Sequence, residues 1–388
     1  MSSEKEKTIG FAALAIRAAA AVFNNQSFTD FCTDYDWQGF VEFCSKHKIL
    51  NTVSCAFAES SEILTEKISK TFSDNVMLSM VKEAQRDVEI ELLSDAFEEN
   101  KIPHMIMKGY VIKDLYPQPF QRSMGDVDIL VGQNIDKASE VILNHGFKFH
   151  GEAFLHDIFK KGDSLYVELH NSLIDESLTD LYDYFGIGFD RAKPKDGFKY
   201  KYELSKEDFY IFLVAHMAKH YKISGTGIRS VCDIYIYNSV YENELDRDYI
   251  WAELDKIELK KFEEKIRNLS YEWFSGEFSG EFDSVGEYII SGGVYGNIDN
   301  HELNAFLLNK EEKQSRFRYI LRTVFPDMTY MQARYPFLQK CPFLLPFYWV
   351  RRFLSTLFKS RGSIRYRLKG VVQSDKSDYD RFDETGLR

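Results

Sequence analysis

Two aspartates, Asp126 and Asp128, stand one residue apart at the start of an apolar run. Side chains alternate between the two faces of a β-strand, so both carboxylates would share one face, about 7 Å apart. Val127, Ile129 and Val131 would then point the other way, into a core. Carboxylate oxygens at this spacing suit one or two hard divalent cations, Mg²⁺ or Mn²⁺. The pattern therefore predicts a metal site.

A third carboxylate for this site is Glu168. Strand alternation places Glu168 and His170 on one face and Val167 and Leu169 on the other. If the strand that carries Glu168 lies beside the strand that carries the two aspartates, the carboxylates of Asp126, Asp128 and Glu168 converge. In two-metal catalysis the aspartates would hold both ions, and Glu168 would hold the ion that activates the acceptor hydroxyl, or act as its base. His170 either orients a phosphate or carboxylate, or is an ordinary hydrogen-bonded histidine.

Phosphate binding is expected from Lys108, Gly109 and Arg122. The apolar run 104–107 ends at Lys108 and Gly109, where the backbone turns into a predicted helix. Amide groups at a helix N-terminus bind phosphate, and Lys108 or Arg122 would neutralise triphosphate charge. The alternative for each cation is an ordinary solvated surface charge.

His216 and His220 lie four residues apart, on one face of a predicted helix. They would line the substrate cleft or form hydrogen bonds within the helical region. Zinc binding is the remaining alternative, but the glutamate of an HExxH motif is missing and the sequence offers no evident third ligand.

The elements that position these residues change along the chain. The α/β core begins near residue 101, where strand-like runs alternate with short helices and a hairpin. The fold class is α+β, a small mixed β-sheet with helical N- and C-terminal regions. The predicted regions are a helical region 1–100, the α/β core 101–200, a helical domain 201–335 and a basic aromatic tail 336–388.

Local patterns set the expected elements. Strands are expected at 104–107, Asp126–Val131, 147–151, 156–160 and 165–169, with core helices at 110–116 and 134–144, the latter capped by Asn134 and ended near Gly146. Ser205 and Asp208 resemble a capping box. Further helices are expected at 9–23, 37–59, 61–100, 228–241, 249–274 and 300–324. The Gly-rich stretch 278–297 is expected to be a loop, and the acidic end from Ser374 to fray.

Composition limits the partners. The net charge of −11 argues against a DNA-coating protein, which needs a basic surface. The five cysteines are odd in number and lack CxxC spacing, which favours a reducing, cytoplasmic compartment. The sequence has no apolar run long enough for a membrane helix.

The tail has the opposite charge. Residues 340–371 include no acidic side chain. The segment 340–369 carries lysines and arginines, and aromatic residues are interleaved at its start. Three interpretations remain open: the aromatic residues pack while the cations are solvated, the segment lies on an anionic membrane surface, or it binds a polyanion such as RNA.

These motifs together resemble the uncharacterised nucleotidyltransferase family, a divergent branch of the polymerase-β-like superfamily met in bacteria. The match lies within residues 100–235 and rests on Lys108-Gly109, Tyr116-Pro117, Arg122, the segment from Met124 to Val131, Gly146-Phe147, the segment from Val167 to His170, and His216 with His220. The resemblance implies a nucleotidyltransferase fold and Mg²⁺-dependent transfer of a nucleoside monophosphate from an NTP to an acceptor that the sequence does not name. The superfamily's serine hydroxyl after the glycine is missing here, since Tyr110 follows Gly109. That departure favours the alternative: an inactive nucleotide-binding or regulatory protein of the same fold, with or without membrane contact.

Overall fold

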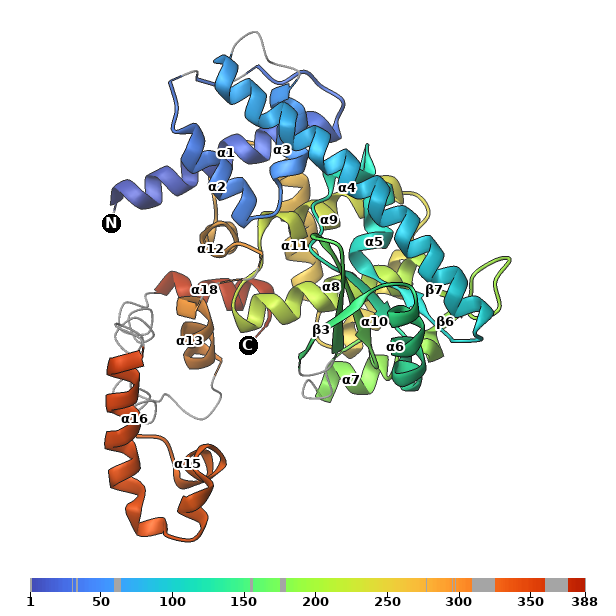
Figure 1. Ribbon diagram of the computed structural model, residues 1–388. Coiled ribbons are helices and arrows are strands. Elements are labelled where there is room, and N and C mark those ends of the chain that lie inside the picture. The colour runs from blue at the N-terminus through green and yellow to red at the C-terminus, as the bar shows by residue number, and fades with distance from the viewer. Residues whose placement is uncertain are drawn as a thin grey trace.

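A five-stranded mixed sheet forms the α/β part of the molecule, and helices from both ends of the chain surround it (Figure 1). The computed structural model describes residues 2–387 except for Asp30, Thr33, 59–63, 154–155, 175–178, Glu277, Tyr295, Asn297, 309–324 and 360–375. The architecture confirms the α+β class expected from the sequence.

The strand order of the sheet brings the predicted site together. The order is β1-β2-β5-β4-β3, in which β2 and β5 are parallel and the other neighbours antiparallel. The register pairs Asp128 with Glu168 across β2 and β5, and His156 with His170 across β4 and β5. The strands are β1 (Met105–Ile106), β2 (Val127–Leu130), β3 (Lys148–Ala153), β4 (His156–Lys161) and β5 (Leu165–His170).

One face of this sheet is mainly apolar, and helices cover it over the central strands β2 and β5. Val127, Ile129, Val167 and Leu169 are buried in a cluster with residues of the helices α4 (Glu66–Glu99) and α6 (Ile135–Asn144). Since alternate residues face opposite ways, the polar residues of the same strands lie on the other face. The helices thus leave only the polar face of these strands open for a site.

The helices of the core begin slightly differently from the prediction. The helix expected at 110–116 begins earlier, as α5 (Lys108–Ile112), and tightens into a 3₁₀ turn at Lys113–Leu115. Asn134 precedes α6, but its side chain does not cap the helix and donates instead to the carbonyl of Val131. Gly146 follows α6 with a positive φ of 83°, as a C-terminal glycine should.

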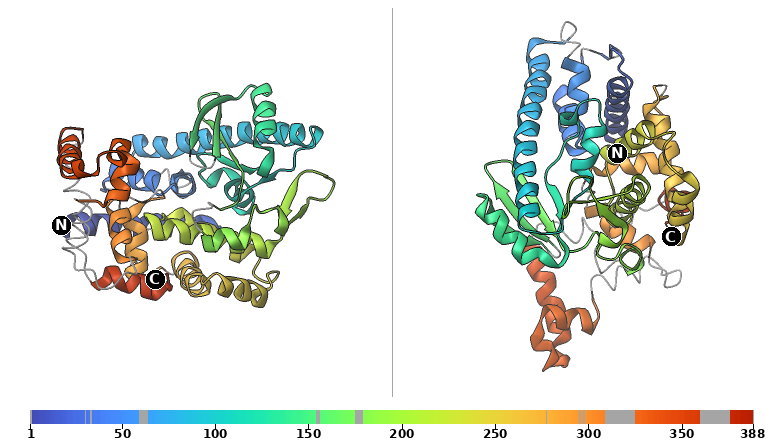
Figure 2. Two further views of the ribbon diagram at one scale, coloured as in Figure 1. Left: turned by 90° about the horizontal axis from the view of Figure 1, so that it is seen from below. Right: turned by 90° about the vertical axis from the view of Figure 1, so that its right-hand side faces the viewer.

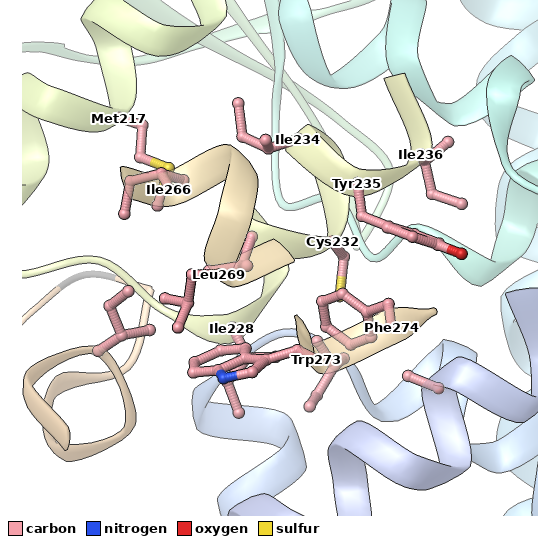
Figure 3. Close-up of a cluster of buried hydrophobic side chains, with 14 of the residues drawn as sticks. Met217, Ile228, Cys232, Ile234, Tyr235, Ile236, Ile266, Leu269, Trp273 and Phe274 are labelled. Atoms are coloured by element: carbon pink, nitrogen blue, oxygen red, sulfur yellow. The ribbon is translucent and has the colours of Figure 1, made fainter. Parts of the chain in front are cut away.

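The helical domain packs on the polar side of the sheet. Ser205 caps its first helix by accepting a hydrogen bond from the Asp208 amide, which is one half of the predicted capping box. Buried residues of the first five helices of this domain and of the N-terminal helix α1 (Ser2–Phe23) form one apolar cluster, part of which is drawn in Figure 3. The helices are α8 (Lys206–Ile223), α9 (Ile228–Val240), α10 (Arg247–Lys256), α11 (Lys260–Phe274), α12 (Ser284–Gly292) and α13 (Ile298–Leu307).

Three expectations for the helical regions were wrong. The stretches 37–59 and 249–274 are each two helices, interrupted where Lys48 and Glu258 adopt positive φ. The Gly-rich stretch 278–297 contains the helix α12. Its Gly286 serves packing and not a turn: a side chain there would meet Trp273 at 3.2 Å, and glycine allows the close approach. The helix expected at 300–324 is described only as α13, since 309–324 lie outside the described residues.

The N-terminal helices join the same apolar cluster as the helical domain, with α1 against α11 and α12. Together with α4 they are α1 (Ser2–Phe23), α2 (Trp37–Lys46) and α3 (Leu50–Ala58). Between core and helical domain lie α7 (Thr179–Phe185) and a two-stranded sheet of β6 (Ala192–Pro194) and β7 (Tyr202–Leu204).

The tail forms short helices and then returns to the body of the molecule. Helix α15 (Met328–Arg334) precedes the tail, whose own helices are α16 (Leu345–Lys359) and α18 (Lys376–Thr385). The expectation that the end frays was wrong, since Phe382 and Leu387 are buried in the main apolar cluster. Among the described residues, no helix combines the length and apolar character that crossing a membrane would require.

Candidate active site

A cleft of about 320 Å³ separates the polar face of the sheet from α8 and α9. Strands β2, β4 and β5 supply one wall, α8 and α9 supply the opposite wall, and the start of α5 contributes to the rim. The structure brings together in this cleft all nine residues proposed from the sequence, namely Lys108, Gly109, Arg122, Asp126, Asp128, Glu168, His170, His216 and His220.

Two neighbouring groups stabilise the negative charge of Asp128. Its Oδ2 accepts from Lys108 Nζ at 3.0 Å, and its Oδ1 lies 2.8 Å from His170 Nε2. Burial opposes the ionised form, but the charge of Lys108 and the hydrogen bond from His170 outweigh it and hold the pKa of Asp128 well below its ordinary value. Asp128 is therefore a carboxylate near neutral pH, and His170 Nε2 donates to it.

The pKa of Glu168 is shifted in the opposite direction, although Glu168 pairs with Asp128 in the register of the sheet. Burial is the largest cause of its shift, and the charges of Asp126 and Asp128 add to it, so that its pKa rises to about 7. Lys108 lowers the pKa less than these raise it. Three carboxyl groups in one half-buried cleft thus share too little positive charge to be ionised together at no cost.

His156 completes this part of the site, and the sequence analysis missed it. Its Nε2 lies 3.1 Å from Glu168 Oε2, and the ring lies 4.9 Å from that of His170. Burial lowers the pKa of His156, and His170 lowers it further. A signal was available: the turn expected between the strands that became β4 and β5 sets an antiparallel register that pairs His156 with His170.

Possible metal ligands gather here. In the part of the chain that the structure describes, His156, Glu168 and His170 are the one group of three whose ligand atoms all lie within 4.8 Å of one another. Asp128 adds a carboxylate beside His170, and Asp126 lines the same cleft. Three carboxyl groups and two imidazoles are a donor set that fits a divalent cation.

The turn at Lys108 and Gly109 is tightly constrained. Lys108 adopts φ of 22°, in the left-handed region that a lysine seldom occupies. A side chain at Gly109 would come within 2.7 Å of Arg122 Nη1 and 3.3 Å of Met124 Sδ. Glycine is therefore required by the close approach of the Arg122 guanidinium to the backbone, and this packing aims Lys108 at Asp128.

Arg122 lies in the cleft wall, with its charge engaged by Asp233. Its Nε and Nη2 donate to the two carboxylate oxygens of Asp233 at 2.8 and 2.7 Å, and the Tyr116 hydroxyl donates to Oδ1 at 2.8 Å. Burial opposes the charge of Arg122, but Asp233 outweighs it and the pKa of the guanidinium is raised. This pair ties the α/β core to α9, so the role of Arg122 shown by the geometry is to fix both walls of the cleft.

His216 and His220 lie on the wall formed by α8. Their Nε2 atoms are 3.0 Å apart, at hydrogen-bonding distance. Burial, followed by the charge of Lys108, lowers the pKa of both imidazoles, that of His220 to about 4. They are neutral near pH 7. The zinc alternative gains no support, since the described residues place no third ligand beside this pair.

A comparison with known families agrees with this geometry. A family model described as uncharacterised nucleotidyltransferase matches residues 33–275, which include every residue of the cleft named above. The chain belongs to this nucleotidyltransferase family. No curated protein and no solved structure matches it significantly.

The Arg122–Asp233 pair generates a stability prediction. Arg122→Met leaves the Asp233 carboxylate buried without its bidentate partner, which should lower the free energy of unfolding by about 3–5 kcal/mol. The double variant Arg122→Met with Asp233→Leu removes both charges and should recover much of this loss. Urea unfolding followed by circular dichroism measures both. Additive losses in the double variant would contradict a coupled pair.

Proposed function

We propose that the protein transfers a nucleoside monophosphate from an NTP to an acceptor hydroxyl, with a divalent cation in the cleft. The observation that carries the proposal is the convergence of three carboxyl groups on a cleft that also holds Lys108: Asp128 and Glu168 lie on neighbouring parallel strands, and Asp126 immediately precedes the first of them. Membership of the nucleotidyltransferase family supports the reaction class.

The electrostatics of the site favour a cation there. The pKa of Glu168 is raised to about 7, first by burial and then by the neighbouring carboxylates, so bound positive charge would stabilise its ionised form. Asp126, Asp128 and Glu168 would hold Mg²⁺ or Mn²⁺. Such an ion would stabilise the charge of the triphosphate and lower the pKa of the acceptor hydroxyl. Lys108, now paired with Asp128, would then be free to contact phosphate oxygens.

The chain's own groups account for the proton and the orientation. The acceptor oxygen attacks the α-phosphorus, a new P–O bond forms, and the bond to pyrophosphate breaks. The acceptor's proton passes to a carboxylate oxygen of Glu168, whose pKa is raised to about 7 without a cation and which bound positive charge would keep ionised and ready to accept the proton. His170 holds Asp128 through its hydrogen bond, and neutral His216 and His220 offer hydrogen bonds to the substrate from the opposite wall.

The competing hypothesis is a protein that binds a nucleotide without turning it over. The residue after Gly109 is Tyr110, so the serine hydroxyl of the superfamily turn is missing. The two hypotheses share nucleotide binding and differ in transfer, so a binding assay combined with a transfer assay separates them.

Replacing the metal-binding carboxylates tests the reaction. Asp126→Asn with Asp128→Asn should reduce transfer of labelled nucleotide by a factor of at least 10³, because amide oxygens bind a hard cation poorly. Asp163→Asn, in the exposed β4–β5 turn, is the matched control and should retain activity. Circular dichroism checks that the fold is kept. Transfer by the double variant at the control rate would contradict the proposal.

Metal preference tests the donor set. His156 lies beside Glu168 and could add an imidazole ligand, which the transition-metal ion Mn²⁺ accepts more readily than the hard ion Mg²⁺ does, so Mn²⁺ with an NTP should raise the melting temperature more than Mg²⁺ with the same NTP. The expected difference between the two metals is about tenfold in affinity, or ~1.4 kcal/mol. His156→Ala should remove most of this difference. Differential scanning fluorimetry with each NTP measures it. No metal-dependent stabilisation by any NTP would contradict both the enzyme and its metal site.

A second proposal concerns the tail, which we place on an anionic membrane surface. Phe343, Phe347 and Val350 are 78%, 62% and 57% exposed, and the exposed Arg351 lies in the same segment. Apolar residues that enter the interface beside cations are typical of peripheral membrane segments. The predicted segment 340–369 extends beyond the described residues after Lys359, and side chains are described only to Arg352.

Vesicle flotation tests the tail. The protein should float with vesicles containing about a third phosphatidylglycerol and not with pure phosphatidylcholine, since binding needs anionic lipid. Phe343→Glu with Phe347→Glu should weaken flotation at least tenfold, because each lost phenylalanine removes about 2 kcal/mol of apolar burial. Phe149→Glu, at a half-exposed phenylalanine of β3, is the control. Binding to RNA but not to vesicles would favour the polyanion interpretation instead.

A further inference from the structure

Helix α4 carries an apolar stripe on the face that points away from the protein. Its opposite face is buried through Phe72, Ile90, Leu93 and Phe97, among others. Yet the outer face exposes a second set of large apolar side chains, each 50–67% exposed: Met77, Leu78, Met80, Val81, Val88 and Leu92. The helix lies along an outer edge of the molecule (Figures 1 and 2). A helix that is apolar on two faces is expected to be covered on both.

The spacing of the stripe is regular. Met77, Val81, Ala84, Val88 and Leu92 follow one another at intervals of three or four residues, which keeps them on one helix face. The stripe spans about 24 Å at 1.5 Å per residue. At on the order of 100 Å² for each half-exposed Met, Leu or Val, the exposed apolar residues offer roughly 600 Å², the upper end for a patch that a monomer leaves open.

The stripe is also self-complementary. A two-fold axis through the middle of α4, between Ala84 and Gln85, relates Met77 to Leu92 and Val81 to Val88. Two antiparallel copies of α4 would therefore place large against large at both ends and the small Ala84 near the axis. Such a match between a surface and its own rotated copy is what a two-fold dimer interface requires.

The charges along α4 favour the same antiparallel orientation. Lys67 and Lys70 lie at the N-terminal end of the helix, whereas Glu91, Asp95 and Glu99 lie at its C-terminal end, and all five are exposed. An antiparallel pair places the lysines of one copy near the carboxylates of the other, while a parallel pair would bring the carboxylates together. Glu66 and Asp74 are carboxylates at the same N-terminal end, so the charge there is balanced, and the antiparallel orientation is favoured because it keeps the two acidic C-terminal ends apart.

We propose that α4 is a homodimer interface, in which two copies of this chain pack antiparallel through Met77, Val81, Ala84, Val88 and Leu92. With the flanking Leu78 and Met80 at the rim of this interface, about 1,200 Å² would be buried in total, which reaches the lower limit of specific protein complexes. The inference does not rest on the nucleotidyl transfer proposed above, because the stripe lies on the face of α4 opposite to the one packed on the protein.

The oligomeric state is the first test. Sedimentation velocity of the full chain at about 10–100 µM, ten to a hundred times a micromolar dissociation constant, should show a dimer. Val81→Glu with Val88→Glu puts four carboxylates at the centre of the interface and should give a monomer. Leu143→Glu with Val240→Glu, at half-exposed residues of α6 and α9, is the control and should remain dimeric. A wild-type monomer, or a glutamate variant that is still a dimer, overturns the proposal.

Cysteine cross-linking tests the orientation without disturbing the fold. In a chain with Cys32 and Cys341 replaced by Ser, Val81→Cys with Val88→Cys should form a disulfide-linked dimer under mild oxidation. The two positions lie about 10 Å apart on one helix, too far for a disulfide within a copy. Val81→Cys alone should not cross-link. A cross-linked dimer from that single variant indicates parallel helices, and no cross-link from the double variant indicates another surface; either result overturns the proposal.

Discussion

The parallel pairing of β2 with β5 is the constraint on which the site depends. It sets Asp128 beside Glu168 in a cleft that is partly withdrawn from water, and like charges so placed repel each other. The groups that stabilise negative charge are distributed unevenly between the two carboxyl groups. Lys108 and His170 stabilise the charge of Asp128, so its pKa falls, whereas burial and the neighbouring carboxylates raise the pKa of Glu168 to about 7. Two carboxyl groups in register thus acquire different protonation behaviour.

This division matters for chemistry because a base and a ligand need different properties. A group that must hold a cation should be ionised throughout the working pH range, and Asp128 meets that requirement. A group that accepts a proton works best with a pKa near the ambient pH, and Glu168 is shifted in that direction. Lys108 contributes to this asymmetry from a strained turn, in which Gly109 allows the close approach of Arg122, and Asp233 fixes Arg122 in turn. A residue of the helical domain therefore helps to position the charge that separates the two carboxyl groups.

The sequence predicted the site better than its supports. Alternation alone placed Asp126, Asp128, Glu168 and His170 on the polar faces of two strands, because period-two burial is a local property. Asp233 was missed as the partner of Arg122 because the two meet only through long-range packing that spacing does not reveal, whereas His156 could have been found from the hairpin register that pairs it with His170.

Helix boundaries failed for a related reason. Lys48 and Glu258 interrupt helices with positive φ, although neither is a glycine or an asparagine that would signal a break. In α12 the error was the reverse: Gly286 looked like a loop residue, but it serves close packing against Trp273. Glycine content predicts a loop only where the backbone needs its freedom, and tertiary packing can use the same residue for lack of a side chain.

Helix α4 links the surface to the cleft. Its inner face binds the segment that follows Lys108, since Lys113 contacts Glu83 and Asp87 at 3.1 and 2.9 Å. It also binds the hairpin that carries His156, through an ion pair between Glu89 and Lys161. A long helix held only from one side can bend or shift along its length, and a shift at either contact would be transmitted to α5 or β4. Covering the outer stripe would therefore do more than remove apolar surface from water: it would hold from both sides the element to which two parts of the site are attached.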